Sequence, residues 1–321
     1  MIRTILKLLA GVAVLLVLAL AAGLGWAHLA IRSERAALPD NAAIASAPTS
    51  AERPVRLTWI NTATQPMPRS AVLDPDGDPG AGKPYVMSHP SFVLEWADGR
   101  ILLVDAGMPR DDAASFGAPL EWAAGAAPIE PLGSIAERLG DALGRVRGVV
   151  FTHLHIDHVG GARELCRDRA DPIVVPMTRA QAENSNYTTR PGRRIVDEAG
   201  CLAVSPLGAE SVQPLPGFPG VAVIAAGGHT PGSQIVLAEV TAGDTTRRYA
   251  FVGDIVNHID GIRLDRGKPL LYRTLLVPED ETRLGELRRM LAALEREHGY
   301  VLLVAHDQQA LESSGVPPFP G

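Results

Sequence analysis

The chain has 321 residues, of which 46% are hydrophobic and 21% charged, so it is long enough to bury a sizeable core and its composition is not that of a disordered protein. A formal net charge of -6, with no long run of Lys and Arg, argues against nucleic acid as a partner. The two cysteines, Cys166 and Cys201, exclude a Cys-rich zinc site and leave room for one disulfide, whose formation stays open.

The first residues form a separate segment. Between Lys7 and Arg32 the sequence has no acidic or basic residue other than His28, and this stretch is long enough to span a bilayer. Residues 1–31 are therefore either a transmembrane anchor or a cleaved signal peptide with Ala19-Leu20-Ala21 as its cleavage site. We favour the anchor, because the apolar character continues past that site. The anchor predicts an extracytoplasmic catalytic domain, periplasmic in a Gram-negative source, whereas cleavage predicts secretion.

Residues 32–54 are rich in Ala, Ser, Pro and charge and show neither helical nor strand periodicity, so we expect a flexible linker. The remaining residues, 55–321, are expected to form one globular domain without internal repeats.

Within this domain, hydrophobic periodicity predicts strands and helices in mixed order. A turn at Asp98-Gly99 is expected to join the first two strands, and an apolar helical face is expected around residues 284–294. The predicted strands span residues 92–96, 101–105, 149–152, 173–175, 221–225, 234–240, 247–252 and 300–304, and a further helix spans 134–143. Such a pattern favours packed sheets with helices outside.

The most informative motif is a histidine-rich stretch directly after the apolar strand that ends at Phe151. His153, His155, Asp157 and His158 occur within six residues, and such groups are costly to place beside a buried strand unless they bind something. Imidazole nitrogens and carboxylate oxygens are ordinary zinc ligands, so the motif predicts a metal site rather than a solvated loop.

At three later places an apolar strand is again followed by a residue of a type that binds metals. These residues are His229, Asp254 and His306. Each alone would usually be an ordinary hydrogen-bonded or capping residue. Their occurrence together, downstream of the first motif, favours a shared site.

The residues His153, His155, Asp157, His158, His229, Asp254 and His306 together resemble the ligand set of the metallo-beta-lactamase-fold hydrolases. Asp105, in Leu103-Val104-Asp105-Ala106-Gly107, resembles an early motif of that superfamily. The resemblance implies an α+β fold, a four-layer αβ/βα sandwich with the metals at one edge.

The resemblance also implies residue roles. His153, His155 and His229 would hold one metal, Asp157, His158 and His306 the other, and Asp254 would bridge two divalent ions, most simply Zn²⁺. Such ions share a hydroxide that attacks a carbonyl of a small-molecule substrate. Asp157 would also orient that hydroxide and transfer a proton, and Asp105 would orient a ligating histidine.

The residue at the bridging position bears on the substrate. The true beta-lactamases of the superfamily carry Cys or Ser where this chain has Asp254, whereas its lactonases, thioesterases and organophosphate hydrolases keep Asp. Local motifs around Asp105, His229 and His306 resemble the N-acyl homoserine lactonase group. Many of those lactonases have Tyr three residues after the bridging Asp, where this chain has Asn257, so Asn257 or Tyr272 would contact the substrate. A lactone or other ester is therefore the expected substrate, with a thioester or organophosphate as the alternative.

Other candidates have plainer interpretations. His89, in Ser88-His89-Pro90, is expected in a turn, with a place in the lining of the pocket as the alternative. His258 is left out of the metal set. Residues 184–194 and 259–273 are expected to be surface loops, with the rim of the active site as the alternative. Two other functional classes remain: a single-iron persulfide dioxygenase and a binding protein without catalysis. Retention of the full ligand set argues against both.

Overall fold

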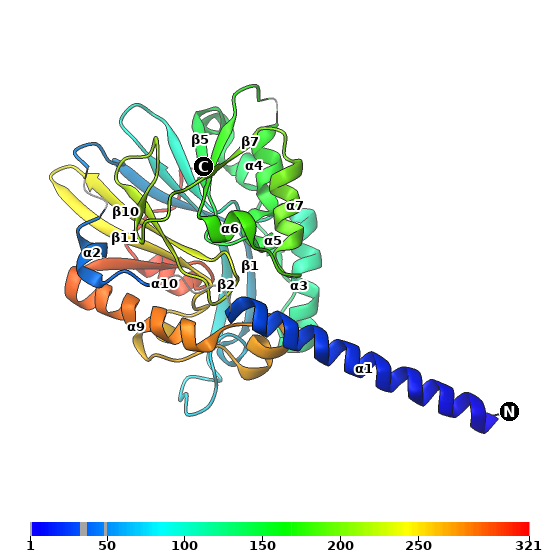
Figure 1. Ribbon diagram of the computed structural model, residues 1–321. Coiled ribbons are helices and arrows are strands. Elements are labelled where there is room, and N and C mark those ends of the chain that lie inside the picture. Colours follow the sequence, from blue (N-terminus) through cyan, green and yellow to red (C-terminus); the bar gives the residue numbers. More distant parts are fainter. Residues whose placement is uncertain (1, 33–36, 48–49, 168, 321) are drawn as a thin grey trace.

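The computed structural model describes residues 2–32, 37–47, 50–167 and 169–320. Helix α1 (Ile2–Arg32) projects from a domain built around two β-sheets (Figure 1). By length and composition α1 could cross a membrane. The residues between Ile2 and Gly23 are exposed, and only the last turns of the helix contact the domain.

The first sheet contains seven strands in the order β4-β1-β2-β3-β5-β6-β7. Its antiparallel half pairs β1 with β2 and β2 with β3, and its parallel half runs from β3 through β5 and β6 to β7. The strands are β1 (Arg56–Pro68), β2 (Pro84–Glu95), β3 (Ile101–Val104), β4 (Glu130–Pro131), β5 (Val146–Val150), β6 (Ile173–Met177) and β7 (Leu202–Pro206).

The second sheet contains five strands in the order β12-β11-β10-β9-β8. It is antiparallel except for the pair β11 and β12. The strands are β8 (Gln213–Pro214), β9 (Val221–Ala225), β10 (Gln234–Ala242), β11 (Thr245–Gly253) and β12 (Tyr300–Val304).

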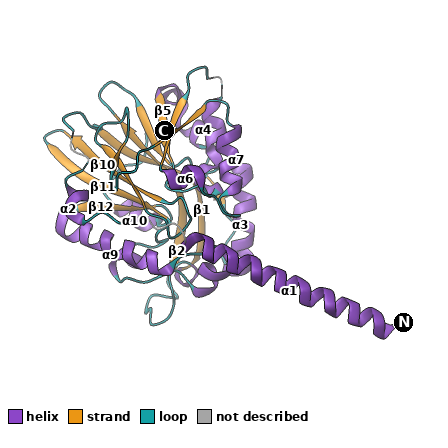
Figure 2. Cartoon of the chain, in the orientation of Figure 1, coloured by secondary structure: helices purple, strands orange, loops and turns teal. Residues whose placement is uncertain are grey.

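Helices cover the outer faces of both sheets (Figure 2). On the first sheet lie α3 (Arg110–Ala124), α4 (Ile135–Leu139), α5 (Ile156–Val159) and α7 (Arg190–Glu198), and on the second lie α2 (Asn41–Ala45), α8 (Asp260–Arg263) and α9 (Glu281–His298). Two short helices, α6 (Arg179–Glu183) and α10 (Gln308–Ser313), follow β6 and β12, and residues Tyr272–Leu276 form a π-helical turn, η4.

Successive side chains of a strand point to opposite faces of the sheet, and apolar side chains occupy both faces here. In β3, Leu102 and Val104 pack between the two sheets, whereas Ile101 and Leu103 pack against helices. In β10, Val236 faces the first sheet. The result is the expected four-layer αβ/βα sandwich.

Most of the predicted elements are present. The strands expected at residues 221–225 and 300–304 coincide with β9 and β12. The helix expected at 134–143 ends as an α-helix at Leu139 and continues as a 3-10 helix from Gly140 to Arg145. Cys166 and Cys201 form a disulfide.

One stretch of the expected flexible linker is instead packed on the domain. Asp40 caps α2 by accepting a hydrogen bond from Ala43 N–H, and Ile44 is fully buried in the core beneath α9. Tyr300 donates its hydroxyl to the carbonyl of Ile44. The expectation of a structureless tether is therefore wrong for Asn41–Ala45, while residues 33–36 and 48–49 of that linker lie outside the described residues.

Candidate metal centre

The residues predicted to bind metal come together at one edge of the two sheets, although four separate stretches supply them. His153 and His155 lie in the loop after β5, and Asp157 and His158 lie in α5. His229 lies between β9 and β10, Asp254 follows β11, and His306 follows β12. All except the half-buried His155 are buried.

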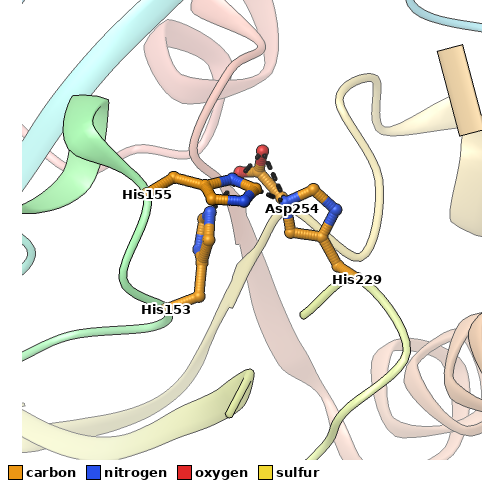
Figure 3. A group of neighbouring side chains, drawn as sticks. All are labelled: His153, His155, His229 and Asp254. Carbon is orange, nitrogen blue, oxygen red and sulfur yellow. Dashed lines mark hydrogen bonds and ion pairs between the residues drawn. The ribbon is translucent and has the colours of Figure 1, made fainter. Parts of the chain in front are cut away.

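Four of these side chains form a first group, shown in Figure 3. One ligand atom from each of His153, His155, His229 and Asp254 lies within 4.8 Å of the others. The Nε2 atom of His229 is 3.1 Å from Nδ1 of His155, and 3.5 Å from Oδ2 of Asp254. Two nitrogens bound to one tetrahedral zinc ion are about 3.3 Å apart, so this spacing fits a shared ion.

A second group shares Asp254 with the first. The Nε2 atoms of His158 and His306 are 3.3 Å apart, and they lie 3.2 and 3.0 Å from Oδ1 of Asp254. Asp157 adds Oδ2 at 3.3 Å from Nε2 of His306. Asp254 thus presents one oxygen to each group of imidazoles.

The outward-facing nitrogen of each imidazole has a partner that fixes the ring. His158 donates from Nδ1 to Asp105, and His306 donates from Nδ1 to the carbonyl of Ser88. The Nε2 atom of His155 lies 2.8 Å from Oγ1 of Thr188. The inward nitrogens therefore converge, as in metal sites whose ligands are oriented by a surrounding shell of hydrogen bonds.

Asp105 contacts the ring of His158, a predicted metal ligand, and has a strained backbone. Its φ angle is 61°, in the left-handed region that non-glycine residues seldom adopt. The carboxylate accepts hydrogen bonds from Thr152 N–H at 2.7 Å and from Thr152 Oγ1 at 2.8 Å. It thereby connects β3, the histidine loop after β5 and the ring of His158.

His229 has a charged partner that sequence reasoning missed. Its Nδ1 atom lies 2.5 Å from Oε1 of Glu279, and Lys268 donates to the same oxygen at 2.6 Å. Lys268 also donates to the carbonyl of Asp254. No local pattern marks Lys268 or Glu279, because each lies dozens of residues from His229 in the sequence.

Burial and neighbouring charges set the protonation of the histidines. Burial and the adjacent imidazoles lower the pKa of His153, and that of His155 to about 3. Burial and the nearby Lys268 ammonium lower the pKa of His229. The ligand nitrogens of all three histidines therefore carry lone pairs at neutral pH. Burial opposes protonation of His158 as well, but the carboxylates around it, led by Asp157, raise its pKa.

The residues present fit a pair of divalent cations. Among the described residues, Nε2 of His153 is buried without a hydrogen-bond partner, although it faces the centre of the cluster. Three buried carboxylates, Asp105, Asp157 and Asp254, also meet here. Buried charges of one sign are costly unless countercharge is supplied, and bound cations would supply it.

His89 does not lie in a turn, contrary to the expectation from Ser88-His89-Pro90. It is buried within β2, and its Nδ1 atom is 3.4 Å from Oδ2 of Asp157. Its ring stacks edge-on against His306 and Phe116, with centroids 5.0 Å away in each case. His89 therefore lies beside the candidate site, in contact with two of the predicted ligands, Asp157 and His306.

A cavity of about 250 Å³ opens onto the cluster. Asp157, Asp254 and His306 lie at its base, and its walls are mostly apolar, including Met87, Phe116, Leu120, Leu276 and Val277. Asn257, Tyr272 and Thr188 also line it. The segments 184–194 and 259–273 thus each contribute a residue to the rim. His258 instead contacts Arg69 and Asp307, away from the ligand groups.

Comparisons with known proteins agree with this geometry. Residues 84–306 match the model of the metallo-beta-lactamase superfamily. No curated protein matches the chain in sequence. A solved structure of an N-acyl homoserine lactone hydrolase with N-hexanoyl-L-homoserine at its catalytic metal centre is similar, with 16% identity, a TM-score of 0.60, and coverage of 84% of this chain and 99% of the other.

Two further structures share the fold. A variant of AiiA from B. thuringiensis with N-decanoyl-L-homoserine bound has the same identity, TM-score and coverage. AidC, a dizinc quorum-quenching lactonase, has 12% identity and a TM-score of 0.51 over 80% of this chain and 91% of the other. The chain therefore belongs to the metallo-beta-lactamase superfamily of metal-dependent hydrolases and has a fold that it shares with N-acyl homoserine lactonases.

Proposed function

We propose that this chain is a dinuclear metal-dependent hydrolase that opens lactones or cleaves related esters. The observation that carries the proposal is the convergence of inward imidazole nitrogens into two groups that share Asp254. His153, His155 and His229 would hold one ion, and Asp157, His158 and His306 the other. Zn²⁺ suits these nitrogen and oxygen ligands.

When bound, two such ions would lower the pKa of a water molecule and polarise the carbonyl that it attacks. Asp157 lies at the base of the cavity and has a carboxylate oxygen available to orient that water and to carry its proton to the leaving oxygen. A single-iron dioxygenase would leave Asp157, His158 and His306 without a function. That alternative therefore explains fewer of the residues in the cluster.

The cavity supports an ester with an apolar group. Tyr272 and Asn257 bring a hydroxyl and an amide to a wall that is mostly apolar, where either could donate a hydrogen bond to the substrate oxygen. Phe116, Leu120 and Leu276 provide surface for an alkyl or acyl chain. This combination favours a lactone or ester with an apolar substituent over a small, highly charged substrate.

The residues also divide into parts with separate roles. We propose residues 1–31 as an anchor and residues 55–321 as the hydrolase domain, held outside the cytoplasm. The disulfide between Cys166 and Cys201 supports this location, because disulfides persist in oxidising compartments.

A substrate screen with the purified full-length protein tests the proposed function. Lactones with acyl substituents of increasing length, a thioester, a phosphotriester and a cephalosporin would be compared before and after chelation. Metal-dependent turnover of lactones or esters supports the proposal, whereas turnover of the cephalosporin alone, or turnover that survives complete metal removal, contradicts it.

A further inference from the structure

Exposed leucines gather in the loop that lies between the cavity and α1. Outside α1, most of the exposed large hydrophobic side chains of the described chain lie in this loop or touch it. Leu270, Leu271, Leu275 and Leu276 are between 49% and 69% exposed, and Tyr187 donates its hydroxyl to the carbonyl of Leu276. We call the segment 270–277, which carries these four leucines, the leucine loop. A patch of this kind on a folded domain usually marks an interaction surface.

The leucine loop is also one wall of the cavity. Tyr272, Leu276 and Val277 line the cavity, while Leu271 and Leu275 point to the outside. The same short segment therefore has an inner face toward the metal ligands and an apolar outer face. A molecule that crosses this rim passes directly from the outer apolar surface into the cavity.

Helix α1 places this loop relative to a membrane. Leu24, Ala27, His28 and Ile31 are covered residues of its last turns that lie on one helical face, and His28 contacts the carbonyl of Thr274 within η4 at 3.0 Å. The two regions lie side by side in Figure 1, where the orange η4 segment meets the end of α1. The helix and the leucine loop are thus joined by a hydrogen bond.

The length of α1 determines where the contact between the helix and the leucine loop lies relative to the bilayer. The uncharged part of the helix begins after Lys7, and about 20 residues are needed to cross the hydrocarbon core of a bilayer. Twenty residues counted from Leu8 end at Ala27, the position at which the domain covers the helix. A helix that spans the membrane would therefore hold the leucine loop at the lipid surface. Trp26, 74% exposed on the opposite face of α1, suits the same depth.

We propose that the leucine loop docks on the surface of the lipid bilayer and that the cavity receives amphiphilic substrates from it. The part about substrates rests on the proposed function, and it narrows the class to lactones or esters whose long acyl chain partitions into membranes. Docking itself depends only on the exposed leucines and their attachment to α1. Apolar side chains at such a position gain free energy when they are buried among acyl chains.

Fluorescence quenching tests docking without any assay of activity. Full-length protein carrying Trp26→Phe and Trp122→Phe would be reconstituted into phosphatidylcholine vesicles with or without brominated acyl chains, and flotation would check insertion. Leu271→Trp places a reporter on the leucine loop, and Val55→Trp places a matched reporter on an exposed residue at the start of the domain. The proposal predicts strong quenching of the first reporter alone. Equal signals in brominated and plain vesicles at Leu271→Trp, equal quenching of both reporters, or failure of the protein to float would overturn it.

Kinetics with the same vesicles test delivery of the substrate. Leu271→Ser combined with Leu275→Ser should raise KM several-fold for a lactone with a dodecanoyl chain, while kcat and the hydrolysis of a water-soluble butanoyl analogue stay unchanged. An unchanged KM for the long-chain lactone would contradict delivery from the membrane. If neither lactone is hydrolysed, the proposed function fails, and the quenching experiment still decides whether the loop docks.

Discussion

Nδ1 of His229 and Oε1 of Glu279 lie 2.5 Å apart in a fully buried contact, so a carboxylate from the segment just before α9 orients a predicted metal ligand. Lys268 balances the charge of that carboxylate. Glu279 and Lys268 together keep Nε2 of His229 pointed toward Asp254.

Substitution Glu279→Gln is expected to weaken metal binding. The amide keeps the size of the side chain but removes the charge that polarises His229, and losses of this kind typically cost about 10- to 100-fold in affinity. Zinc affinity would be measured by competition with a chromophoric chelator. Glu297→Gln, an exposed site on α9, is the control and should bind zinc like the wild type. Equal affinities in all three proteins would refute the role of Glu279.

At Asp105, two substitutions separate backbone conformation from charge. Asparagine tolerates the left-handed φ of 61°, whereas alanine does so at a cost of about 1 kcal/mol or more. Asp105→Asn should therefore keep most of the thermal stability but bind zinc more weakly, because His158 loses its carboxylate partner. Asp105→Ala should lose both thermal stability and zinc affinity. Thermal unfolding and chelator competition check the pair, and tight zinc binding by the Asn variant would speak against the assignment.

Asp157→Asn separates catalysis from metal binding. His158, Asp254 and His306 remain to hold the ion, so most metal should be retained, while kcat should fall by about 100-fold or more through loss of the proton-carrying carboxylate. Asp111→Asn in the exposed first turn of α3 is the control. Metal analysis and kcat are measured on the same samples. A kcat equal to that of the wild type in Asp157→Asn would contradict the proposed mechanism.

His89 should make the metal-free domain sensitive to acid. Burial lowers its pKa from the ordinary 6.5 to about 4, despite the opposing influence of Asp157. The folded state therefore binds fewer protons than the unfolded state, so its contribution to stability is complete above pH 6.5 and is lost as the pH falls toward 4. The loss between pH 7 and pH 5 is roughly 2 kcal/mol.

Substitution His89→Phe tests this dependence. The ring of Phe cannot titrate, so after chelation the free energy of unfolding should fall less between pH 7 and pH 5 than it does in the wild type. Urea unfolding at the two pH values measures the difference. An identical fall in both proteins would show that other groups cause the acid sensitivity.

Much of the sheet structure and the ligand positions could be predicted because short-range patterns encode them. The strands at residues 221–225 and 300–304 are apolar runs bounded by turn residues, and each of the predicted ligands lies within four residues after such a strand or belongs to the histidine motif. The apolar face of α9 contains Leu284, Leu287, Leu291 and Leu294, all buried as its periodicity indicates.

Other features depend on tertiary contacts that no local pattern reports. Pro90 suggested a turn at His89, but β2 tolerates it because Pro90 pairs with Asn61 at the edge of a register shift in β1. The five residues of α2 are too few for a periodicity to emerge, and Ile44 is buried only because α9 covers it. Glu279 and Lys268 reach His229 from another part of the chain.

Metal content per chain tests the central claim most directly. The purified full-length protein and His229→Ala would be saturated with zinc, freed of excess ion and assayed by mass spectrometry. Two ions per wild-type chain and one per His229→Ala chain are the predicted result. One iron per wild-type chain, or no bound metal with every ligand residue intact, would contradict a dinuclear hydrolase.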